Sequence, residues 1–180
     1  MSDHELMELL RNENSRDKAF QELVLRYQER LYWHIRKIVL NHDDTDDVLQ
    51  NTFMKAWKNI HTFREESSLF TWLYRIATNE SLTFINSRSR RSLVPMNDVY
   101  DYLKSRLEAD EYYDGGEIQK KLQLAILTLP EKQKLVFNLR YFEEMPYQEM
   151  SEILDTSVGA LKASYHHAVK KVEEYLSNLE

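Results

Sequence analysis

The chain has 180 residues, of which 42% are hydrophobic, and this is enough for one ordinary domain or two small ones, each with its own core. Its 24 basic and 30 acidic side chains give a net charge of −6, which argues against a polycationic protein that coats nucleic acid. The sequence has no cysteine, so disulfide frameworks and thiolate-bound metal sites are excluded.

The first residues and the hydropathy pattern favour a cytoplasmic chain. The start, from Met1 to Glu5, is acidic and is followed by broken apolar pairs, unlike the basic and then apolar regions of a signal peptide. No segment approaches the roughly 18 uninterrupted apolar residues of a membrane span. We therefore expect no insertion of the chain into a membrane.

Apolar residues recur at steps of three and four along almost the whole chain, which only three glycines and three prolines interrupt. This pattern predicts an all-α protein. We expect one helix over residues 20–40, a second that opens with Asp43 or Asp44 as its cap, and a third over about 68–90. Together they predict an N-terminal helical bundle over residues 1–93.

The middle of the chain, residues 94–117, carries most of the net charge. It holds 2 basic and 7 acidic side chains, whereas residues 1–93 hold 14 of each and residues 118–180 hold 8 basic and 9 acidic ones. It also contains Pro95 and a double glycine. We therefore expect a flexible acidic linker that could extend over about 80 Å and let two modules be placed independently.

Residues 118–180 predict a second helical domain that ends in a helix-turn-helix. Amphipathic runs cover about 118–129 and 131–141, and a short helix is expected over 147–154 after a proline. A tight turn then leads to Ser157, whose side chain is of a type that caps helices, and to a long final helix. Because any helical hairpin can imitate this pattern, the pattern alone is only moderately specific.

Catalytic patterns are scarce in this sequence. It has no glycine-rich phosphate loop and no His-Glu-x-x-His motif, and the spacing of its six histidines does not suit a helical di-iron site. His166 and His167 are neighbours on a predicted helix and face different directions, so we expect no shared metal there. The sequence predicts a protein that is not an enzyme and that uses no metal or cofactor.

A polar ridge with an apolar centre runs along the second predicted helix, opposite the stripe of Leu49, Phe53 and Trp57 that is expected to face the core. By periodicity alone, this ridge could simply be a solvated helix face. The ridge consists of Asp47, Gln50, Asn51, Met54 and Lys58.

The run of residues 44–57 resembles a conserved segment of bacterial sigma factors of the extracytoplasmic-function (ECF) group, whose pattern is close to D-A-E-D-x-x-Q-E-x-F-x-K-x-W. In that family the ridge binds the clamp helices of the largest RNA polymerase subunits, so the resemblance implies core RNA polymerase as a partner. Asn51 stands where the family usually has Glu, which removes one charge from this contact. The matching residues are Asp44, Asp47, Gln50, Phe53, Lys55 and Trp57.

Residues 63–79 are similar to the next segment of the same family, F-R-x-x-S-x-F-x-T-W-L-Y-R-I-A-x-N. The aromatic and aliphatic residues are expected in the core, whereas Thr71, Arg75 and Asn79 recur at steps of four and predict one polar face. In family members the loop before this helix and the Asn capture a base flipped out of the minus-ten promoter element. Three arginines near the end of this helix could bind phosphates or could simply be a solvated helix end. The predicted minus-ten residues are Phe63, Arg64, Thr71, Arg75, Asn79, Arg88, Arg90 and Arg91.

The predicted helix-turn-helix, from Leu129 to Lys162, resembles the segment with which the family binds the minus-thirty-five element. Many relatives carry Arg where this chain has Ser164, His167 and Val169, so the family's base preferences cannot be carried over. The first half of the last helix holds no acidic residue, which favours a surface that faces phosphates. The predicted contact residues are Lys162, Ser164, Tyr165, His166, His167, Lys170 and Lys171. Of these, Tyr165 could instead anchor the helix in the core.

The three matches follow one another in the family's order, so the chain is identified as a member of the ECF sigma factors. The resemblance implies a protein that binds core RNA polymerase, reads the minus-thirty-five element of promoter DNA, and opens and traps the minus-ten element. The acidic linker would thread through the polymerase cleft. An anti-sigma factor, which is often membrane-anchored in this family, is an expected partner that would cover the same polymerase-binding surfaces.

Two other functions stay open at this point. A helix-turn-helix regulator that acts without core polymerase would explain residues 118–180 but would leave the ridge and the polar face unused. A helical adaptor that binds only protein would fit the net negative charge but not the acid-free start of the recognition helix. Binding to core RNA polymerase separates the three functions.

Overall fold

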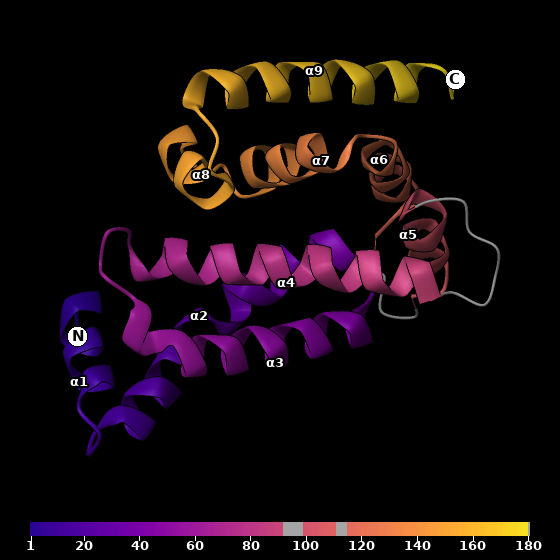
Figure 1. Cartoon of the computed structure of the whole chain (residues 1–180). Coiled ribbons are helices and arrows are strands. Elements are labelled where there is room, and N and C mark those ends of the chain that lie inside the picture. Colours follow the sequence, from indigo (N-terminus) through magenta and orange to yellow (C-terminus); the bar gives the residue numbers. More distant parts are fainter. Residues whose placement is uncertain (92–98, 111–114, 180) are drawn as a thin grey trace.

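The computed structural model describes residues 1–91, 99–110 and 115–179, which form helices joined by short connections (Figure 1). These residues contain no strand, so the prediction of an all-α protein is confirmed. Residues 94–98 and 111–114 of the predicted linker lie outside the described residues. In chain order the elements are α1 (Asp3–Arg11), α2 (Arg16–Val39), α3 (His42–Asn59), the 3-10 helix η1 (Ile60–Thr62), α4 (Leu69–Arg91), α5 (Val99–Glu108), α6 (Glu117–Leu127), α7 (Glu131–Phe137), the π-helix η2 (Asn138–Phe142), α8 (Tyr147–Leu154) and α9 (Val158–Ser177).

Side chains cap the helices α1 and α3. At the start of α1, Ser2 Oγ accepts a hydrogen bond from the backbone N–H of Glu5 at 3.2 Å, and Ser2 N donates to the Glu5 carboxylate at 2.6 Å. The cap of α3 is Asn41, whose side-chain oxygen accepts from Asp44 N at 3.0 Å. The prediction that Asp43 or Asp44 caps this helix is therefore wrong, because Asn41 takes that role two residues earlier.

The helices α2, α3 and α4 pack against one another and form the N-terminal bundle. Their buried faces follow the apolar stripes in the sequence, since Leu31, Ile35 and Leu73 are wholly buried. At one end of the α2–α3 contact, Phe20 and Trp57 meet edge to face with ring centroids 4.9 Å apart. The bundle therefore uses one face of α3 for its core and leaves the opposite face outside.

The segment predicted as a flexible linker contains a helix, α5, that packs on α4. Leu103 and Leu107 are buried, and Arg106 binds the Asp44 carboxylate at 2.8 Å. Arg36 of α2 forms an ion pair with the buried Asp110. Residues 99–110 are thus ordered against the bundle. The high net charge of the segment hid a short apolar stripe that is sufficient to dock it.

The helices α6, α7, α8 and α9 form the C-terminal domain, in which α8 and α9 make the predicted helix-turn-helix. Asp155 ends α8 with a φ of 50°, and Ser157 caps α9 by accepting from Ala160 N at 3.2 Å. The predicted helix over 131–141 is divided, because α7 passes into a π-helical turn at Asn138.

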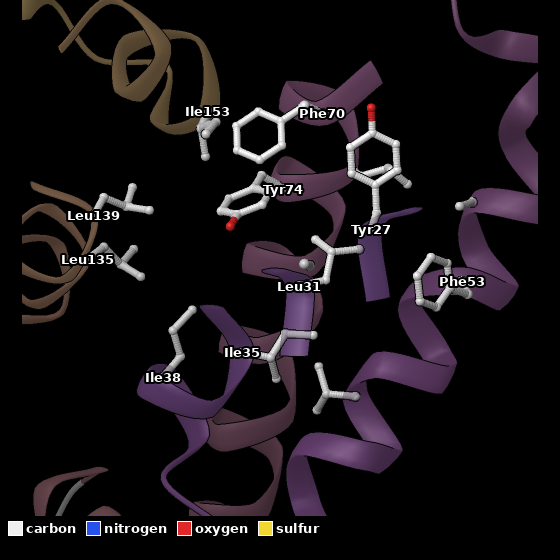
Figure 2. Packing of buried hydrophobic residues seen from close by; sticks show 14 of the residues in the cluster. Tyr27, Leu31, Ile35, Ile38, Phe53, Phe70, Tyr74, Leu135, Leu139 and Ile153 are labelled. Atoms are coloured by element: carbon white, nitrogen blue, oxygen red, sulfur yellow. The ribbon is translucent and has the colours of Figure 1, made fainter. Parts of the chain in front are cut away.

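One hydrophobic core runs across the contact between the two domains, and a smaller one lies within the C-terminal domain. Leu135 and Leu139 of the C-terminal domain and Ile153 of α8 lie opposite Tyr74 and Ile38 of the N-terminal bundle (Figure 2). All five side chains are buried. The C-terminal domain therefore lies along α4 rather than apart from it, as Figure 1 also shows.

Among the described residues, no helix is both long and apolar enough to cross a bilayer. In the same part of the chain there is no group of three or more acidic or histidine side chains that could hold a metal ion.

Candidate functional site

The polar ridge of α3 lies on the outer surface of the bundle. The opposite side of the helix contributes Val48, Phe53 and Ala56 to the core. An exposed methionine, Met54, with half of its surface accessible, supplies an apolar centre between charged and amide groups. The ridge thus offers both apolar contact and hydrogen bonds to a partner. All of its predicted members are exposed, namely Asp47, Gln50, Asn51, Met54 and Lys58.

Asp44, which matched the same sequence pattern, has a different surrounding. Its carboxylate is buried and accepts from Arg106 Nε at 2.8 Å. Burial raises the pKa of Asp44, although the Arg106 guanidinium opposes this shift. Asp44 therefore joins α3 to α5 inside the chain and does not extend the exposed ridge.

A pocket with a volume of about 360 Å³ lies at the segment between η1 and α4. The Phe63 ring is buried and stands 5.2 Å from the Trp72 ring, while Arg64 is exposed at the rim. Ser67, Arg75 and the backbone around them add polar groups to the aromatic wall. The size falls within the range of about 300–1,000 Å³ that is usual for ligand pockets. The pocket can accept a flat, polar-edged group.

Thr71 does not share a polar surface with Arg75 and Asn79, so that prediction is wrong. Thr71 is 1% exposed, and its backbone N–H donates to Ser68 Oγ at 3.1 Å. Four residues advance a helix by slightly more than one turn, so two such steps move a side chain about 80° around the axis. This rotation carries Thr71 into the core while Arg75 and Asn79 stay outside.

Arg75 and Asn79 lie on the side of α4 that the C-terminal domain covers. The guanidinium of Arg75 donates to the backbone carbonyl of Glu152 in α8. Both residues line a groove of about 490 Å³ whose other wall includes Ile153 and Asp155. A ligand of this face must therefore share the groove with α8 or displace it.

The end of α4 carries the predicted arginine patch. Arg88, Arg90 and Arg91 are all exposed, and the Arg88 guanidinium stands 5.1 Å from the centre of the Phe84 ring. Arg90 and Arg91 line an open groove of about 860 Å³ that also includes Asn79. The patch is thus continuous with the amide side chain of Asn79 along one side of the helix.

The recognition helix α9 presents most of its predicted contact residues to the outside. Tyr165 is half-buried, its ring lies 6.1 Å from that of Phe137, and burial raises the pKa of its hydroxyl. This packing anchors the helix, as the alternative interpretation of Tyr165 stated. Ser164 is also half-buried, whereas the exposed residues are Lys162, His166, His167, Lys170 and Lys171.

The comparisons with known proteins follow the same division of the chain. Residues 23–91 match the Sigma-70 region 2 family, and residues 119–172 match Sigma-70 region 4. The ECF RNA polymerase sigma-E factor of Haemophilus influenzae is 31% identical over 172 residues, covering 90% of this chain and 89% of the relative. The chain belongs to the ECF sigma factors. The ECF sigma-E factor of Escherichia coli K12 is 29% identical over 177 residues, which cover 90% of this chain and 88% of the relative.

Two solved structures share the fold of this sigma factor. One is the sigma factor RpoE of Bartonella quintana in complex with the anti-sigma factor NepR, with a TM-score of 0.66 and 22% identity over 89% of this chain and 98% of that one. The other is CnrH in complex with the cytosolic domain of CnrY. Its TM-score is 0.67 and its sequence identity 21%, and the match covers 98% of this chain and 97% of that one.

The family settles the choice between the three functions. As a sigma factor, the protein directs transcription initiation by RNA polymerase. A helix-turn-helix regulator that acts without core polymerase is not favoured, because the region 2 match covers the bundle that such a regulator would leave unused. The same match argues against an adaptor that binds only protein.

The contact between the two domains includes a buried carboxylate that the sequence did not indicate. Glu143 accepts a hydrogen bond from the Tyr74 hydroxyl at 2.8 Å, and His34 Nδ1 lies 3.5 Å from its other oxygen. Burial alone would raise the pKa of Glu143, but the contacts with His34 and Tyr74 outweigh it and lower the pKa below its usual value. The same burial raises the pKa of Tyr74 and lowers that of Lys37.

Glu143 was missed because it precedes a Met-Pro pair in a segment that reads as a loop. Its partners are the buried side chains of His34 and Tyr74, which belong to α2 and α4 and lie far from Glu143 in the sequence. His34 is 44 residues before Thr78, to which its Nε2 is hydrogen-bonded at 2.7 Å. The periodicity of a single helix therefore could not predict that these side chains meet.

Proposed function

We propose that the sigma factor divides its work among three surfaces. The ridge of α3 binds core RNA polymerase, the pocket before α4 together with Arg75 and Asn79 captures the minus-ten element, and α9 binds the minus-thirty-five element. The observation that carries the proposal is that every ridge residue is exposed, while the opposite side of α3 is used by the core. The protein then acts by binding, with no catalytic step of its own.

The chemistry of the pocket suits an extruded base. Its aromatic lining, from Trp72 and Phe63, can stack with a base, and Arg64 and Ser67 can hydrogen-bond to the base edge. Flipping a base costs a few kcal/mol, which such a pocket must offset. The arginine patch at the end of α4 adds the phosphate contacts that hold the strand in register.

The recognition helix combines positioning with limited base reading. The exposed lysines, Lys162, Lys170 and Lys171, can contact phosphates as point charges. His167 and Ser164 are the remaining polar groups that can approach base edges, since Tyr165 is held by the core. We therefore propose that base discrimination by α9 is modest.

Promoter binding requires the two domains to separate. As their names indicate, the minus-ten and minus-thirty-five elements are about 25 base pairs apart, which corresponds to about 85 Å of duplex. In the structure, α8 packs on α4 and α9 packs on α8, so α9 lies about two interhelical distances, or about 20 Å, from α4. The segment over 94–117 could span the difference if α5 leaves the bundle.

We also propose regulation by an anti-sigma factor. The two similar structures contain sigma factors bound to NepR and to the cytosolic domain of CnrY. A protein of this kind, soluble or membrane-anchored, would compete with polymerase for the ridge of α3. The place of action is the cytoplasm, where promoter DNA and RNA polymerase are found together.

Replacement of two ridge residues tests the polymerase contact. Asp47→Ala with Gln50→Ala should weaken binding to core RNA polymerase at least tenfold, while the free energy of unfolding changes by less than about 0.5 kcal/mol because both side chains are exposed. The matched control is Glu117→Ala with Gln119→Ala, which removes one carboxylate and one amide from the exposed start of α6. Equal affinities of the two variants would contradict the assignment.

A further inference from the structure

Glu65, in the segment between η1 and α4, has a backbone φ of 58°. This left-handed region is unfavourable for a residue with a side chain, so such a residue persists there only when its surroundings hold it. Leu40 and Asp155 have similar φ values, but both end helices, where this conformation is common. Glu65 ends no α-helix, so its conformation needs another cause.

That cause is the first helix of the chain, α1, which lies beside the segment (Figure 1). Arg11 Nη2 lies 2.9 Å from Glu65 Oε1, and the same nitrogen donates to the backbone carbonyl of Phe63 at 3.5 Å. His4 Nδ1 lies 3.2 Å from the other carboxylate oxygen, Oε2. Arg11 therefore holds the side chain of Glu65 and the backbone two residues before it at once.

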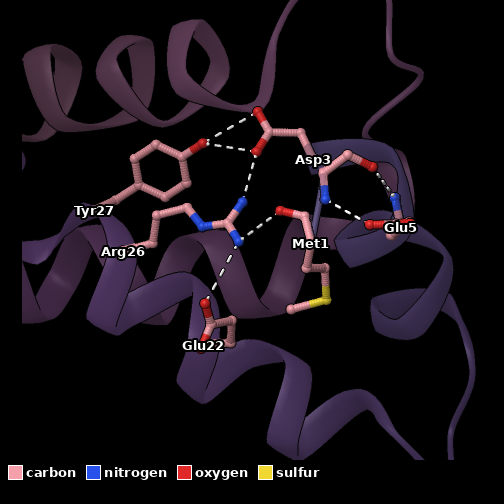
Figure 3. A network of polar contacts seen from close by, with 7 residues as sticks. Met1, Asp3, Glu5, Glu22, Arg26 and Tyr27 are labelled. Atoms are coloured by element: carbon pink, nitrogen blue, oxygen red, sulfur yellow. Dashed lines mark hydrogen bonds and ion pairs between the residues drawn. The ribbon is translucent and has the colours of Figure 1, made fainter.

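The helix α1 is itself fixed to the bundle (Figure 3). Asp3 accepts from the Tyr27 hydroxyl at 3.1 Å and from Arg26 Nη1 at 3.0 Å, and both donors belong to α2. Burial beside the Asp3 carboxylate raises the pKa of Tyr27 to about 12, so its hydroxyl keeps its proton at neutral pH. The apolar face of α1, with Leu6 and Leu10, is wholly buried. Arg11 thus extends from a rigid support.

The residues on both sides of Glu65 form the pocket before α4. Phe63 and Arg64 precede it, Glu66 and Ser67 follow it, and all four line the pocket. A change in the backbone at Glu65 would turn these side chains relative to the fixed Trp72 ring. The ion pair between Arg11 and Glu65 thus lies at the centre of the segment that lines the pocket.

We propose that Arg11 is a positioning residue for base capture, which fixes the pocket in a shape that accepts one unstacked nucleobase of the minus-ten element. This inference rests on the proposed function of the pocket. Arg11 acts through Glu65 and Phe63. A partly exposed ion pair contributes little to folding stability, so its main effect is on local shape.

The test uses holoenzyme assembled from the full chain and core RNA polymerase. Its binding to fluorescent single-stranded oligonucleotides is measured, with the base varied at each minus-ten position in turn. For Arg11→Gln we expect about a threefold loss of selectivity at one position only, in line with the small worth of such a pair, with an unchanged melting temperature. Lys18→Gln, which removes one positive charge from the exposed face of α2, is the control and should keep wild-type selectivity.

Three further variants separate positioning from a general loss of charge. Arg11→Lys should restore part of the selectivity, because Lys keeps a positive charge beside Glu65 but lacks the planar guanidinium that fixes the direction of the contact. Glu65→Gln should reproduce the loss, and the double variant Arg11→Gln with Glu65→Gln should lose no more than either single one. If the wild type is selective and Arg11→Gln has the same selectivity, the role of Arg11 is overturned while the proposed function of the pocket stands. A wild type that selects no base at any position would overturn the proposed function, and the inference with it.

Discussion

The ridge of α3 and the outer face of α4 are both predicted binding surfaces, but the folded chain treats them differently. The ridge residues are all exposed, and none of their side chains enters the contact between the domains. On α4, Arg75 binds the backbone of α8, and Asn79 lines the groove that α8 closes. The ridge is fully open to a partner, whereas the face of α4 is shared with α8 of the same chain.

From this difference we infer an order for the proposed steps of initiation. Core polymerase can contact the ridge without any movement of the two domains. For the minus-ten strand to occupy this groove fully, α8 would have to leave α4, and this would cost the apolar contact of Ile153, Leu135 and Leu139 with the bundle. A sigma factor built in this way is expected to bind promoter DNA poorly until polymerase has bound it.

The largest effect is expected from a charge within the contact between the domains. Ile153→Asp would place a carboxylate opposite Phe70 and Tyr74, and an unpaired buried charge costs about 3–5 kcal/mol. We expect the domains to separate, which small-angle scattering would show as a larger radius of gyration. The control, Leu179→Asp, puts the same charge on an exposed leucine. Identical scattering of the two variants would contradict the shared core.

Glu143 gives a second and smaller way to weaken the contact. Glu143→Gln removes the charge that faces His34 and Lys37, and we expect a loss of about 1–2 kcal/mol from the closed arrangement. Its neighbour Glu144 is exposed, so Glu144→Gln is a matched control. Hydrogen exchange of the α4 amides measures the effect. Equal protection in both variants would show that Glu143 does not hold the domains.

The same residue makes the closed arrangement sensitive to acid. The pKa of Glu143 is lower in the folded protein than its ordinary value of 4.5, so its contribution is fully present above about pH 4.5 and is lost as the pH falls through the lowered pKa. We therefore expect the difference in exchange between wild type and Glu143→Gln to shrink below pH 4.5. A difference that is constant from pH 7 to pH 3 would be incompatible with the lowered pKa.

The smallest effect is expected on α9, which is not covered by the bundle. Lys162→Ala should weaken holoenzyme binding to all promoters about equally and reduce the slope of log K against log salt by about 1, because one phosphate contact is lost. Lys121→Ala removes an exposed lysine from α6 and should leave the slope unchanged. A change in the preferred base for Lys162→Ala would mean that this residue reads sequence.

The sequence was informative where one helix decides the outcome by itself. The apolar stripes of α2, α3 and α4 predicted which faces are buried, and the short helix, turn and Ser157 cap predicted the helix-turn-helix. The ridge followed from the same periodicity, since it is the face opposite the stripe of Phe53.

The sequence was misleading where distant elements meet. Thr71 faces the core, although its spacing suggested a polar face, and α5 is docked by Leu103 and Leu107 in a segment that looked too acidic to fold. Glu143 lies in a loop-like segment and finds its partners on α2 and α4. Periodicity gives the direction of a side chain but not the helix that it meets.

We expect promoter opening to require the two domains to separate. Because the chain has no cysteine, Thr83→Cys and Glu131→Cys, two exposed residues that line the groove between α4 and α7, can be joined by a reducible cross-linker. The measurement is promoter opening by holoenzyme made with the cross-linked protein, before and after reduction. We predict that the cross-linked protein binds core polymerase but opens no promoter, and that reduction restores opening. Normal opening with the cross-link intact would contradict the account.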